Sequence, residues 1–175
     1  MDRPIILCIV AESGAGKSTV SDYIADMYGW QLIESRTTRP PRTPDETGHT
    51  FVSEEEFSSY KPVDMIAYTI FGTAKYCCLK KDVHLRSLYV IDEFGLKYLK
   101  ENFSDEYNII SLRLHRNIDR RIESVGRDRV ARDEGKFTMT DSEFDYVIPV
   151  QPNDVLRYVL ERVDYIMNDI LDKHV

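Results

Sequence analysis

The feature that most constrains the fold is a run of small residues between an apolar segment and an amphipathic one. Residues 5–10 are all apolar and mostly β-branched, and Ala11-Glu-Ser-Gly-Ala-Gly-Lys17-Ser18-Thr19 follows them directly. The apolar run predicts a strand that is buried on both faces of a parallel sheet. Val20 and Ile24 lie at helical spacing, which predicts a helix over residues 17–28. The chain is therefore expected to begin with a strand, a glycine turn and a helix.

This turn has the composition of a phosphate-binding loop (P-loop). Glycine lets the backbone curl so that several N–H groups point at one anion, and the helix start adds the positive end of its dipole. Lys17 supplies a charge for the β- and γ-phosphates, and Ser18 offers a hydroxyl to Mg²⁺. Ala11 stands where the usual pattern has glycine, which is the smallest change available. The residues predicted to bind ATP with Mg²⁺ are Ser13, Gly14, Ala15, Gly16, Lys17, Ser18 and Thr19.

The rest of the chain alternates predicted strands with predicted helices. Strands are expected at 31–34, 87–91, 108–114 and 145–149, a hairpin at 65–71 and 75–79, and helices at 93–103, 118–125 and near the C-terminus. Alternation of this kind implies right-handed βαβ units on a parallel sheet. The predicted fold is a three-layer α/β P-loop domain with a parallel core sheet, a description that does not by itself separate kinases from ATPases, GTPases or nucleotide-binding scaffolds. Residues 35–50, which contain three prolines and Gly48, are expected to be irregular.

Composition limits the partners and the compartment. The 175 residues, 42% of them hydrophobic, are enough for one domain with a real core. A net charge of -7 makes a poor general nucleic-acid binder, so an anionic ligand must be held by a local cluster. Cys8, Cys77 and Cys78 offer neither a disulfide framework nor zinc spacing. Residues 5–10 are too few to span a bilayer. We expect a reduced, cytoplasmic protein with no nucleic-acid or membrane partner.

The second informative region is residues 35–57, Ser-Arg-Thr-Thr-Arg-Pro-Pro-Arg-Thr-Pro-Asp-Glu-Thr-Gly-His-Thr-Phe-Val-Ser-Glu-Glu-Glu-Phe. Arg39 and Arg42 lie in a proline-stiffened loop, where two guanidinium groups can bind a phosphate monoester bidentately. The alternative is a solvated basic loop. The stretch resembles the acceptor domain of guanylate kinases, which carries Ser-x-Thr-Thr-Arg-x-Pro-Arg, a glycine, Phe-Val-Ser and a glutamate-rich helix start.

The resemblance implies roles for individual residues of the acceptor site. Arg39 and Arg42 are expected to hold the acceptor phosphate, with Tyr76 helping, and Ser35 to touch the acceptor base. Tyr76 could instead be a core aromatic of the hairpin. Asp92 ends an apolar strand and matches an aspartate that organises Mg²⁺ or its waters beside the acceptor; it could also cap the helix that follows.

The resemblance also implies a division of the chain and a lid. A core of residues 1–34 and 83–175 is expected to carry an acceptor-binding insertion at 35–82 and a lid at about 126–140. Arg127, Arg129 and Arg132 lie in the lid stretch. Together with Lys17, they are the candidate catalytic residues, because arginines that close over ATP stabilise the transferring phosphoryl group and exclude water. Each could instead be a surface charge.

The chain departs from the guanylate kinase pattern where the base is read. Ala67, nine residues before Tyr76, stands where the family has a glutamate that reads guanine. The other departures are Cys78 for a serine, Val90 for an aspartate, Phe94 for a glutamine and His49 for a phosphate-binding tyrosine. His49 could donate to a phosphate or be an exposed loop residue. Loss of a base-reading carboxylate removes a strong discrimination, so purine selectivity is open.

Three functions follow from these observations. The first is ATP-dependent phosphoryl transfer to a nucleoside monophosphate, with GMP or dGMP as the acceptor. The second is a kinase of another phosphorylated small molecule, such as ribose 1,5-bisphosphate, which the missing base readers favour. The third is a non-catalytic binding module like the guanylate-kinase-like domains of scaffold proteins. Such modules typically lose the P-loop lysine, whereas Lys17 is present here.

Overall fold

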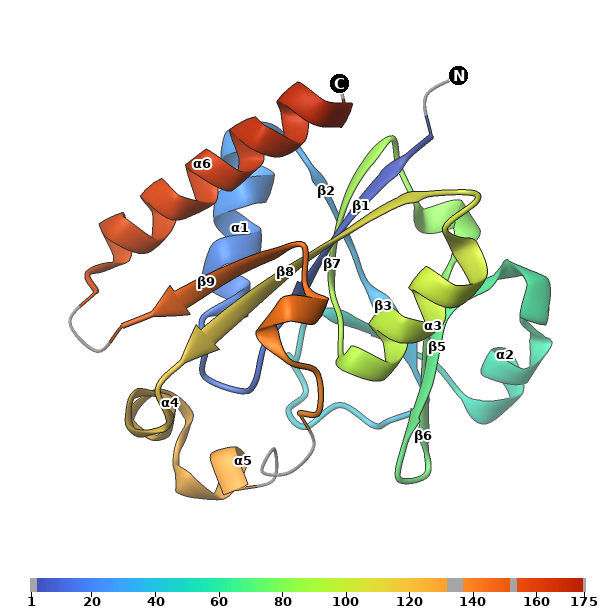
Figure 1. Ribbon diagram of the computed structural model, residues 1–175. Helices are drawn as coiled ribbons and strands as arrows, with labels where there is room; N and C mark the ends of the chain where they lie inside the picture. Colours follow the sequence, from blue (N-terminus) through green and yellow to red (C-terminus); the bar gives the residue numbers. More distant parts are fainter. Residues whose placement is uncertain (1–2, 132–136, 152–153, 175) are drawn as a thin grey trace.

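The core is a five-stranded sheet with the order β2-β7-β1-β8-β9, and each neighbouring pair is parallel. The structure is a computed structural model that describes residues 3–131, 137–151 and 154–174 (Figure 1). The strands are β1 (Ile5–Val10), β2 (Gln31–Ile33), β7 (Arg86–Val90), β8 (Asn108–Arg116) and β9 (Tyr146–Val150). The predicted parallel sheet is confirmed.

Helices cover both faces of this sheet. Helices α1 (Lys17–Tyr28) and α6 (Leu156–His174) pack on one face, and α3 (Glu93–Phe103) packs on the other (Figure 1). Strand β1 serves both layers, because alternate side chains of a strand point to opposite faces. Leu7 lies in the cluster with α1 and α6, whereas Cys8 lies in the cluster with α3. The three-layer α/β architecture is therefore as predicted.

A second, smaller sheet follows β2, with the strand order β4-β3-β6-β5. It consists of β3 (Ser35–Thr37), β4 (His49–Phe51) and the hairpin β5 (Met65–Phe71) and β6 (Ala74–Leu79). Helix α2 (Glu54–Ser59) adds Phe57 to a separate apolar cluster with Cys77 and Leu79. The hairpin is as predicted, and Ser53 caps α2 by accepting from the Glu56 N–H. This sheet lies on one side of the core (Figure 1).

The expectation that residues 35–50 are irregular was wrong at both ends. Residues 35–37 pair with β6 on one side and with β4 on the other. These hydrogen bonds join segments far apart in the sequence, so local composition does not predict them. Two short strands thus fix the ends of the proline-containing loop, with Ser35 at the first and His49 at the second.

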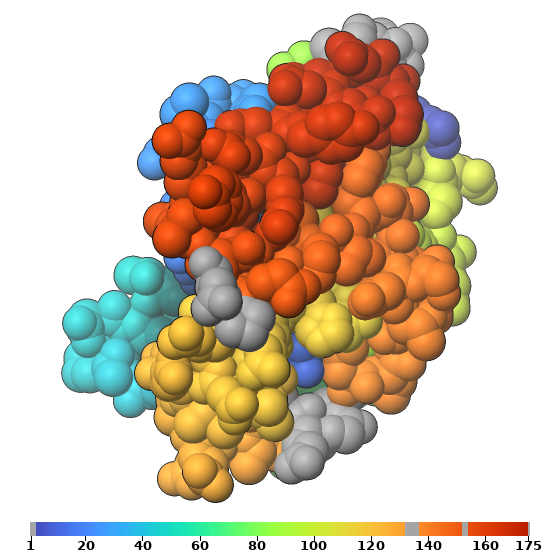
Figure 2. All heavy atoms as spheres, turned by 60° about the vertical axis from the view of Figure 1, so that its left-hand side comes forward, coloured from blue at the N-terminus to red at the C-terminus, as the bar shows by residue number. Residues whose placement is uncertain are grey.

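The chain after β8 forms a lobe of short helices. Helix α4 (Ile118–Val125) is as predicted, and α5 (Arg127–Ala131) makes the first part of the expected lid helical. Figure 2 shows α4 and α5 in gold below the core, with the loop that precedes β4 in cyan beside them. Within the described residues, no helix has the length and apolar character needed to cross a membrane.

Candidate active site

The glycine-rich loop between β1 and α1 has the conformation that its sequence predicts. Gly14 and Gly16 have φ values of 80° and 97°, in the left-handed region that favours glycine. A Cβ atom on Gly14 would also lie 2.9 Å from the backbone oxygen of Arg121. Gly16 is the N-cap of α1, which leaves the first N–H groups of that helix directed at the loop. Backbone curvature and space therefore both require glycine at position 14.

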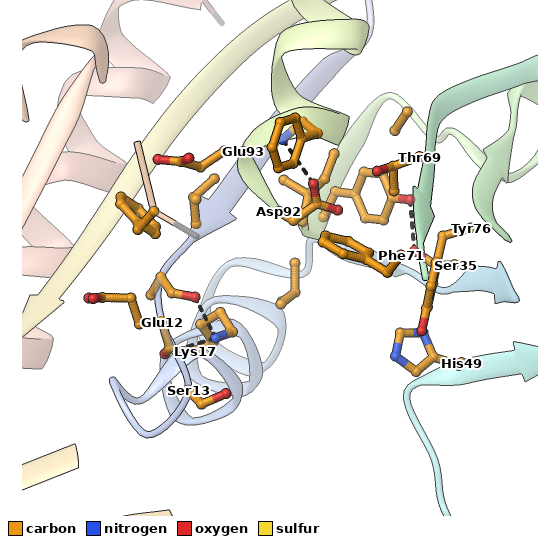
Figure 3. A pocket seen from close by; sticks show the side chains of 18 of the residues that line it. Glu12, Ser13, Lys17, Ser35, His49, Thr69, Phe71, Tyr76, Asp92 and Glu93 are labelled. Carbon is orange, nitrogen blue, oxygen red and sulfur yellow. Dashed lines mark hydrogen bonds between the residues drawn. The ribbon is translucent and has the colours of Figure 1, made fainter. Parts of the chain in front are cut away.

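Lys17 begins α1 and lies across the mouth of the loop. Its Nζ donates to the backbone oxygens of Ala11 at 2.7 Å and Glu12 at 3.0 Å (Figure 3). Ser13 and Lys17 line a cavity, whereas Ser18 is exposed at the start of the helix. The ammonium group is thus held where the β- and γ-phosphates of a nucleotide are expected to bind.

Two arginines, one at the end of β8 and one in α4, donate hydrogen bonds to the loop, and sequence reasoning missed both. Arg121 of α4 is buried; its Nη1 donates to Glu12 Oε1 at 2.8 Å and its Nε to the backbone oxygen of Ser13 at 2.9 Å. Arg116 at the end of β8 donates to the backbone oxygen of Gly14 at 3.0 Å. These contacts join residues more than 100 positions apart, so no local pattern could have revealed them.

The two acceptor arginines converge on one carboxylate, Glu46. Arg39 Nη1 and Nη2 donate to the Glu46 oxygens at 3.1 and 2.8 Å, and the Arg42 backbone N–H donates at 2.5 Å. Hydrogen bonds from Arg39 and from the Arg42 backbone lower the pKa of Glu46 to about 2. The structure therefore brings Arg39 and Arg42 together, as predicted, and adds a residue that the sequence had not singled out.

Ser35, His49 and Tyr76 form the wall next to these arginines. The Ser35 and Tyr89 hydroxyls are hydrogen-bonded at 2.8 Å, and the His49 and Tyr76 rings make an edge contact with centroids 5.9 Å apart. Burial, followed by the Arg39 charge, lowers the pKa of His49, so its imidazole is neutral at pH 7. The interpretation of His49 as an exposed loop residue was wrong, because β4 places it in the cavity wall.

Asp92 and Glu93 lie where β7 meets α3. Asp92 caps α3 by accepting from the N–H groups of Phe94 at 2.8 Å and Gly95 at 3.0 Å, and burial raises its pKa. The helix-cap alternative for Asp92 is therefore realised, and its carboxylate still lines the cavity. Glu93, which sequence reasoning missed, is buried and accepts from the backbone N–H groups of Thr138 and Met139.

The arginines predicted to lie in a lid differ in their position relative to the cavity. Arg129 of α5 lines the cavity, whereas Arg127 is exposed and lies outside the cavity lining. Arg132 lies outside the described residues. Of the predicted catalytic arginines that the structure describes, Arg129 is therefore the one at the candidate site.

These residues surround one cavity of about 410 Å³. Glu12, Ser13 and Lys17 lie at one end, Ser35, His49 and Tyr76 at the other, and Phe71 and Asp92 between them (Figure 3). Arg42 also lines it, with 58% of its side chain exposed, whereas the Arg39 side chain is 15% exposed and lies outside the cavity lining. The glycine-rich loop and the segment predicted to bind the acceptor thus border one cavity.

The cavity differs from the guanine-reading pattern as the sequence predicts. Ala67 sits in an irregular part of the β5–β6 pairing with φ of 54°, and no carboxylate projects from that position. Among the described lining residues, the carboxylates are Glu12, Asp92 and Glu93, and each has a partner described above. Cys78 is buried and donates to the Leu79 backbone oxygen, outside the cavity lining.

The donor set fits Mg²⁺ bound with a nucleotide better than a resident metal. No cluster of three or more histidine, cysteine or acidic ligands occurs in the described part of the chain. Mg²⁺ usually keeps several waters and takes only one or two protein ligands beside substrate phosphates. The Ser18 hydroxyl at the start of α1 and the Asp92 carboxylate in the cavity are candidates for those positions.

Comparisons with known proteins point in one direction. No family model matches the chain. The guanylate kinase of Neisseria gonorrhoeae is 47% identical over 57 residues, which cover 31% of this chain and 28% of that protein. The guanylate kinase of Fusobacterium nucleatum is 32% identical over 119 residues, which cover 63% of this chain and 64% of that protein. The chain thus matches less than two thirds of the length of these relatives.

A solved structure extends the likeness to the whole fold. The crystal structure of guanylate kinase from Anaplasma phagocytophilum superposes with a TM-score of 0.68, covering 99% of this chain and 88% of that one. Sequence identity over this superposition is 18%. The fold is therefore retained across a large divergence in sequence.

Proposed function

We propose that the chain is a divergent relative of the guanylate kinases and that it transfers the terminal phosphoryl group of ATP to a nucleoside monophosphate. GMP and dGMP are the first acceptors to test. The observation that carries the proposal is the single cavity that joins Lys17 of the P-loop to Arg42, Ser35 and Tyr76 of the acceptor segment. A site that only bound a nucleotide has no need of this second set of groups.

At the ATP end, the proposal assigns phosphate binding to the loop backbone and Lys17. The left-handed glycines and the start of α1 suit an anion, and the brace from Arg116 and Arg121 holds that curvature before a nucleotide arrives. Bound Mg²⁺ would neutralise charge on the phosphates, with Ser18 and Asp92 as its protein partners.

At the acceptor end, two unpartnered buried atoms support phosphate binding. Arg39 Nε and His49 Nδ1 are buried without a hydrogen-bond partner among the described residues. Buried polar groups normally have partners, and each exception asks for a ligand, a water or strain. The oxygens of a phosphate monoester beside Arg39 and Arg42 can accept hydrogen bonds from the Arg39 Nε–H and from an N–H of the neutral His49 imidazole.

The chemistry proposed is direct in-line transfer without a covalent enzyme intermediate. Lys17 and Arg129 stabilise charge on the transferring group, while Arg39 and Arg42 hold the acceptor oxygen in line. Positioning and charge neutralisation supply the catalysis, so no side chain of this site is required as a general base.

The second candidate, a kinase of another phosphorylated small molecule such as ribose 1,5-bisphosphate, rests on Ala67. A site without a base-reading carboxylate does not require a base. The third candidate, a non-catalytic binding module, is weakened by Lys17, which occupies the mouth of an intact loop.

An ADP-release assay with Mg²⁺-ATP separates these candidates. The acceptors to compare are GMP, dGMP, the other nucleoside monophosphates and ribose 1,5-bisphosphate. Turnover of one or more nucleoside monophosphates supports the proposal, and turnover of the sugar bisphosphate alone contradicts it in favour of the second candidate. No turnover on any acceptor, with ATP still bound, favours the binding module.

A further inference from the structure

A continuous row of aromatic rings lines one side of the cavity. Phe94 contacts Phe71, Phe71 contacts Tyr76, and Tyr76 contacts His49, each edge to face, with centroids 6.4, 5.9 and 5.9 Å apart. All four rings line the cavity, and we call them the aromatic wall. It extends from the start of α3 to the acceptor arginines.

Two members of the aromatic wall are large apolar side chains left open to solvent. Phe71 is 38% exposed and Phe94 is 52% exposed. Phe71 lies midway along the cavity, between Lys17 and Ser35 (Figure 3). Open apolar rings that line a cavity with convergent polar groups are typical of a surface that a ligand covers. Nucleobases suit such rings, because every base has a flat π-face that can stack on them.

The polar groups beside the aromatic wall are hydroxyls. Ser35 and Tyr89 share a hydrogen bond in which either oxygen can be the donor, and Thr69 adds a third, mostly buried hydroxyl. A hydroxyl both donates and accepts, so it can meet a base edge of either kind. The carboxylates among the described lining residues are each engaged elsewhere, by Arg121, by the start of α3 or by the segment at 138–139.

We propose that the acceptor base binds against Phe71 and Phe94 and that rotatable hydroxyls read its edge, so that this site phosphorylates nucleoside monophosphates with different bases. The inference rests on the proposed function and specifies its substrate class. Stacking of a base on an aromatic side chain is worth roughly 5- to 150-fold in affinity by alanine substitution and tolerates any base. We therefore expect kcat/KM values for GMP, AMP, CMP and UMP to lie within about tenfold of one another, because hydroxyl reading does not reject a base as a fixed carboxylate does.

The first test removes the rings. Phe71→Ala and Phe94→Ala should each raise KM for GMP and for AMP by about 30-fold, the middle of the range for stacking. Inhibition by ribose 5-phosphate, which has the phosphate but no base, should stay unchanged. Phe71→Tyr and Phe94→Tyr keep a ring and should restore the parent KM. Tyr165→Leu, which alters an exposed aromatic residue of α6, is the matched control. Both phenylalanines are partly exposed, so the variants are expected to fold, and a thermal melt checks this.

The outcomes separate the inference from the function on which it rests. Similar kcat/KM values across the four nucleotides, with a ring-dependent KM, support the inference. A preference of about a thousandfold for one base, or ring variants that weaken ribose 5-phosphate as much as GMP, overturns the inference but leaves a nucleoside monophosphate kinase. Turnover of ribose 1,5-bisphosphate with none of any nucleotide overturns both.

Discussion

The two ends of the cavity are built in different ways. At the proposed ATP end, the expected binding groups are mostly backbone N–H groups of one short loop, and arginines from α4 and β8 donate hydrogen bonds to that loop. At the proposed acceptor end, the expected binding groups are side chains from the loop between β3 and β4, from strands β3, β4, β5 and β6, and from the start of α3. One end depends on the shape of the backbone, and the other depends on the identity of individual side chains.

This difference bears on where the sequence matches the guanylate kinase pattern and where it departs from it. A loop that binds through its backbone tolerates few substitutions, since Gly14 is fixed both by its φ angle and by its distance to Arg121. A wall of side chains can be altered one residue at a time without loss of the fold. Four departures from the guanylate kinase pattern, at His49, Ala67, Val90 and Phe94, line the cavity, whereas the P-loop departs from its usual pattern at Ala11.

The largest effect is expected at the ATP end. Lys17→Ala should lower kcat by about a thousandfold, because a single preorganised charge at the transferring group is worth that much in a water-excluded site. ADP release measures the loss, and a thermal melt checks that the variant is folded after losing the hydrogen bonds from Lys17 to the loop oxygens. Lys81→Ala, at an exposed lysine, is the control. Turnover of the Lys17→Ala variant near the parent rate would contradict the role of Lys17 at the transferring phosphoryl group.

The next effect should be confined to the acceptor end. Arg42→Ala should raise the acceptor KM by roughly 10- to 100-fold, because a hydrogen bond to a charged group contributes about 1.5–3 kcal/mol. The ATP KM should change less than about twofold, since the P-loop is unaltered. Steady-state kinetics with each substrate varied in turn measures both values. An equal rise in the two KM values would contradict the assigned role of Arg42.

The third prediction concerns Arg121, which contacts the P-loop. Its substitution should alter the ATP KM through the shape of that loop. Arg121→Met removes the brace and leaves Glu12 without its ion pair, which is expected to cost up to about 3 kcal/mol of unfolding free energy. We expect the ATP KM to rise by about tenfold as the loop loses its fixed curvature, with a smaller change for the acceptor.

The double variant sharpens this third prediction. Glu12→Gln combined with Arg121→Met removes both charges and should be more stable than Arg121→Met alone, because no unpaired carboxylate is left beside the loop. Chemical denaturation of the parent, the two single variants and the double variant gives the coupling free energy between Glu12 and Arg121. Additive losses would mean that the Glu12–Arg121 contact does not hold the P-loop.

The elements and residue positions that the sequence predicted correctly are those that depend on a pattern within one short stretch of the chain. The P-loop, helix α1 and the β5–β6 hairpin each follow from residues within one short stretch, and the structure has them where expected. The two arginines that hold Glu46 were also predicted to lie together, because a proline-stiffened loop brings them close.

The parts that sequence missed depend on contacts between distant segments. Glu12 meets Arg121 across 109 positions, and Glu93 meets Met139 across 46. The aromatic wall needs β4, β5, β6 and α3 in place before its rings touch. Residues of this kind carry no local signature, and only the tertiary fold reveals them.

The smallest effect is expected from Glu46, which orients the acceptor arginines without belonging to the cavity lining. Glu46→Gln should raise the acceptor KM by about two- to fivefold, because it removes an ion pair with Arg39 but leaves a side chain of similar size. It should also lower the melting temperature, and this second effect depends on pH. The pKa of Glu46 is about 2 in the folded protein against an ordinary value of 4.5. Because the folded state lowers this pKa, the contribution is complete above pH 4.5 and is lost as the pH falls towards 2.

The difference in melting temperature between the parent and Glu46→Gln should therefore be constant above about pH 5 and should narrow below pH 4.5. Glu55→Gln, at an exposed residue of α2, controls for the loss of one negative charge and should show no such narrowing. A gap that persists unchanged down to pH 3 would mean that the ionised carboxylate does not hold Arg39 and Arg42. The geometry of the acceptor end would then come from the strand pairing of β3 and β4. That end would depend on the shape of the backbone, as the ATP end does.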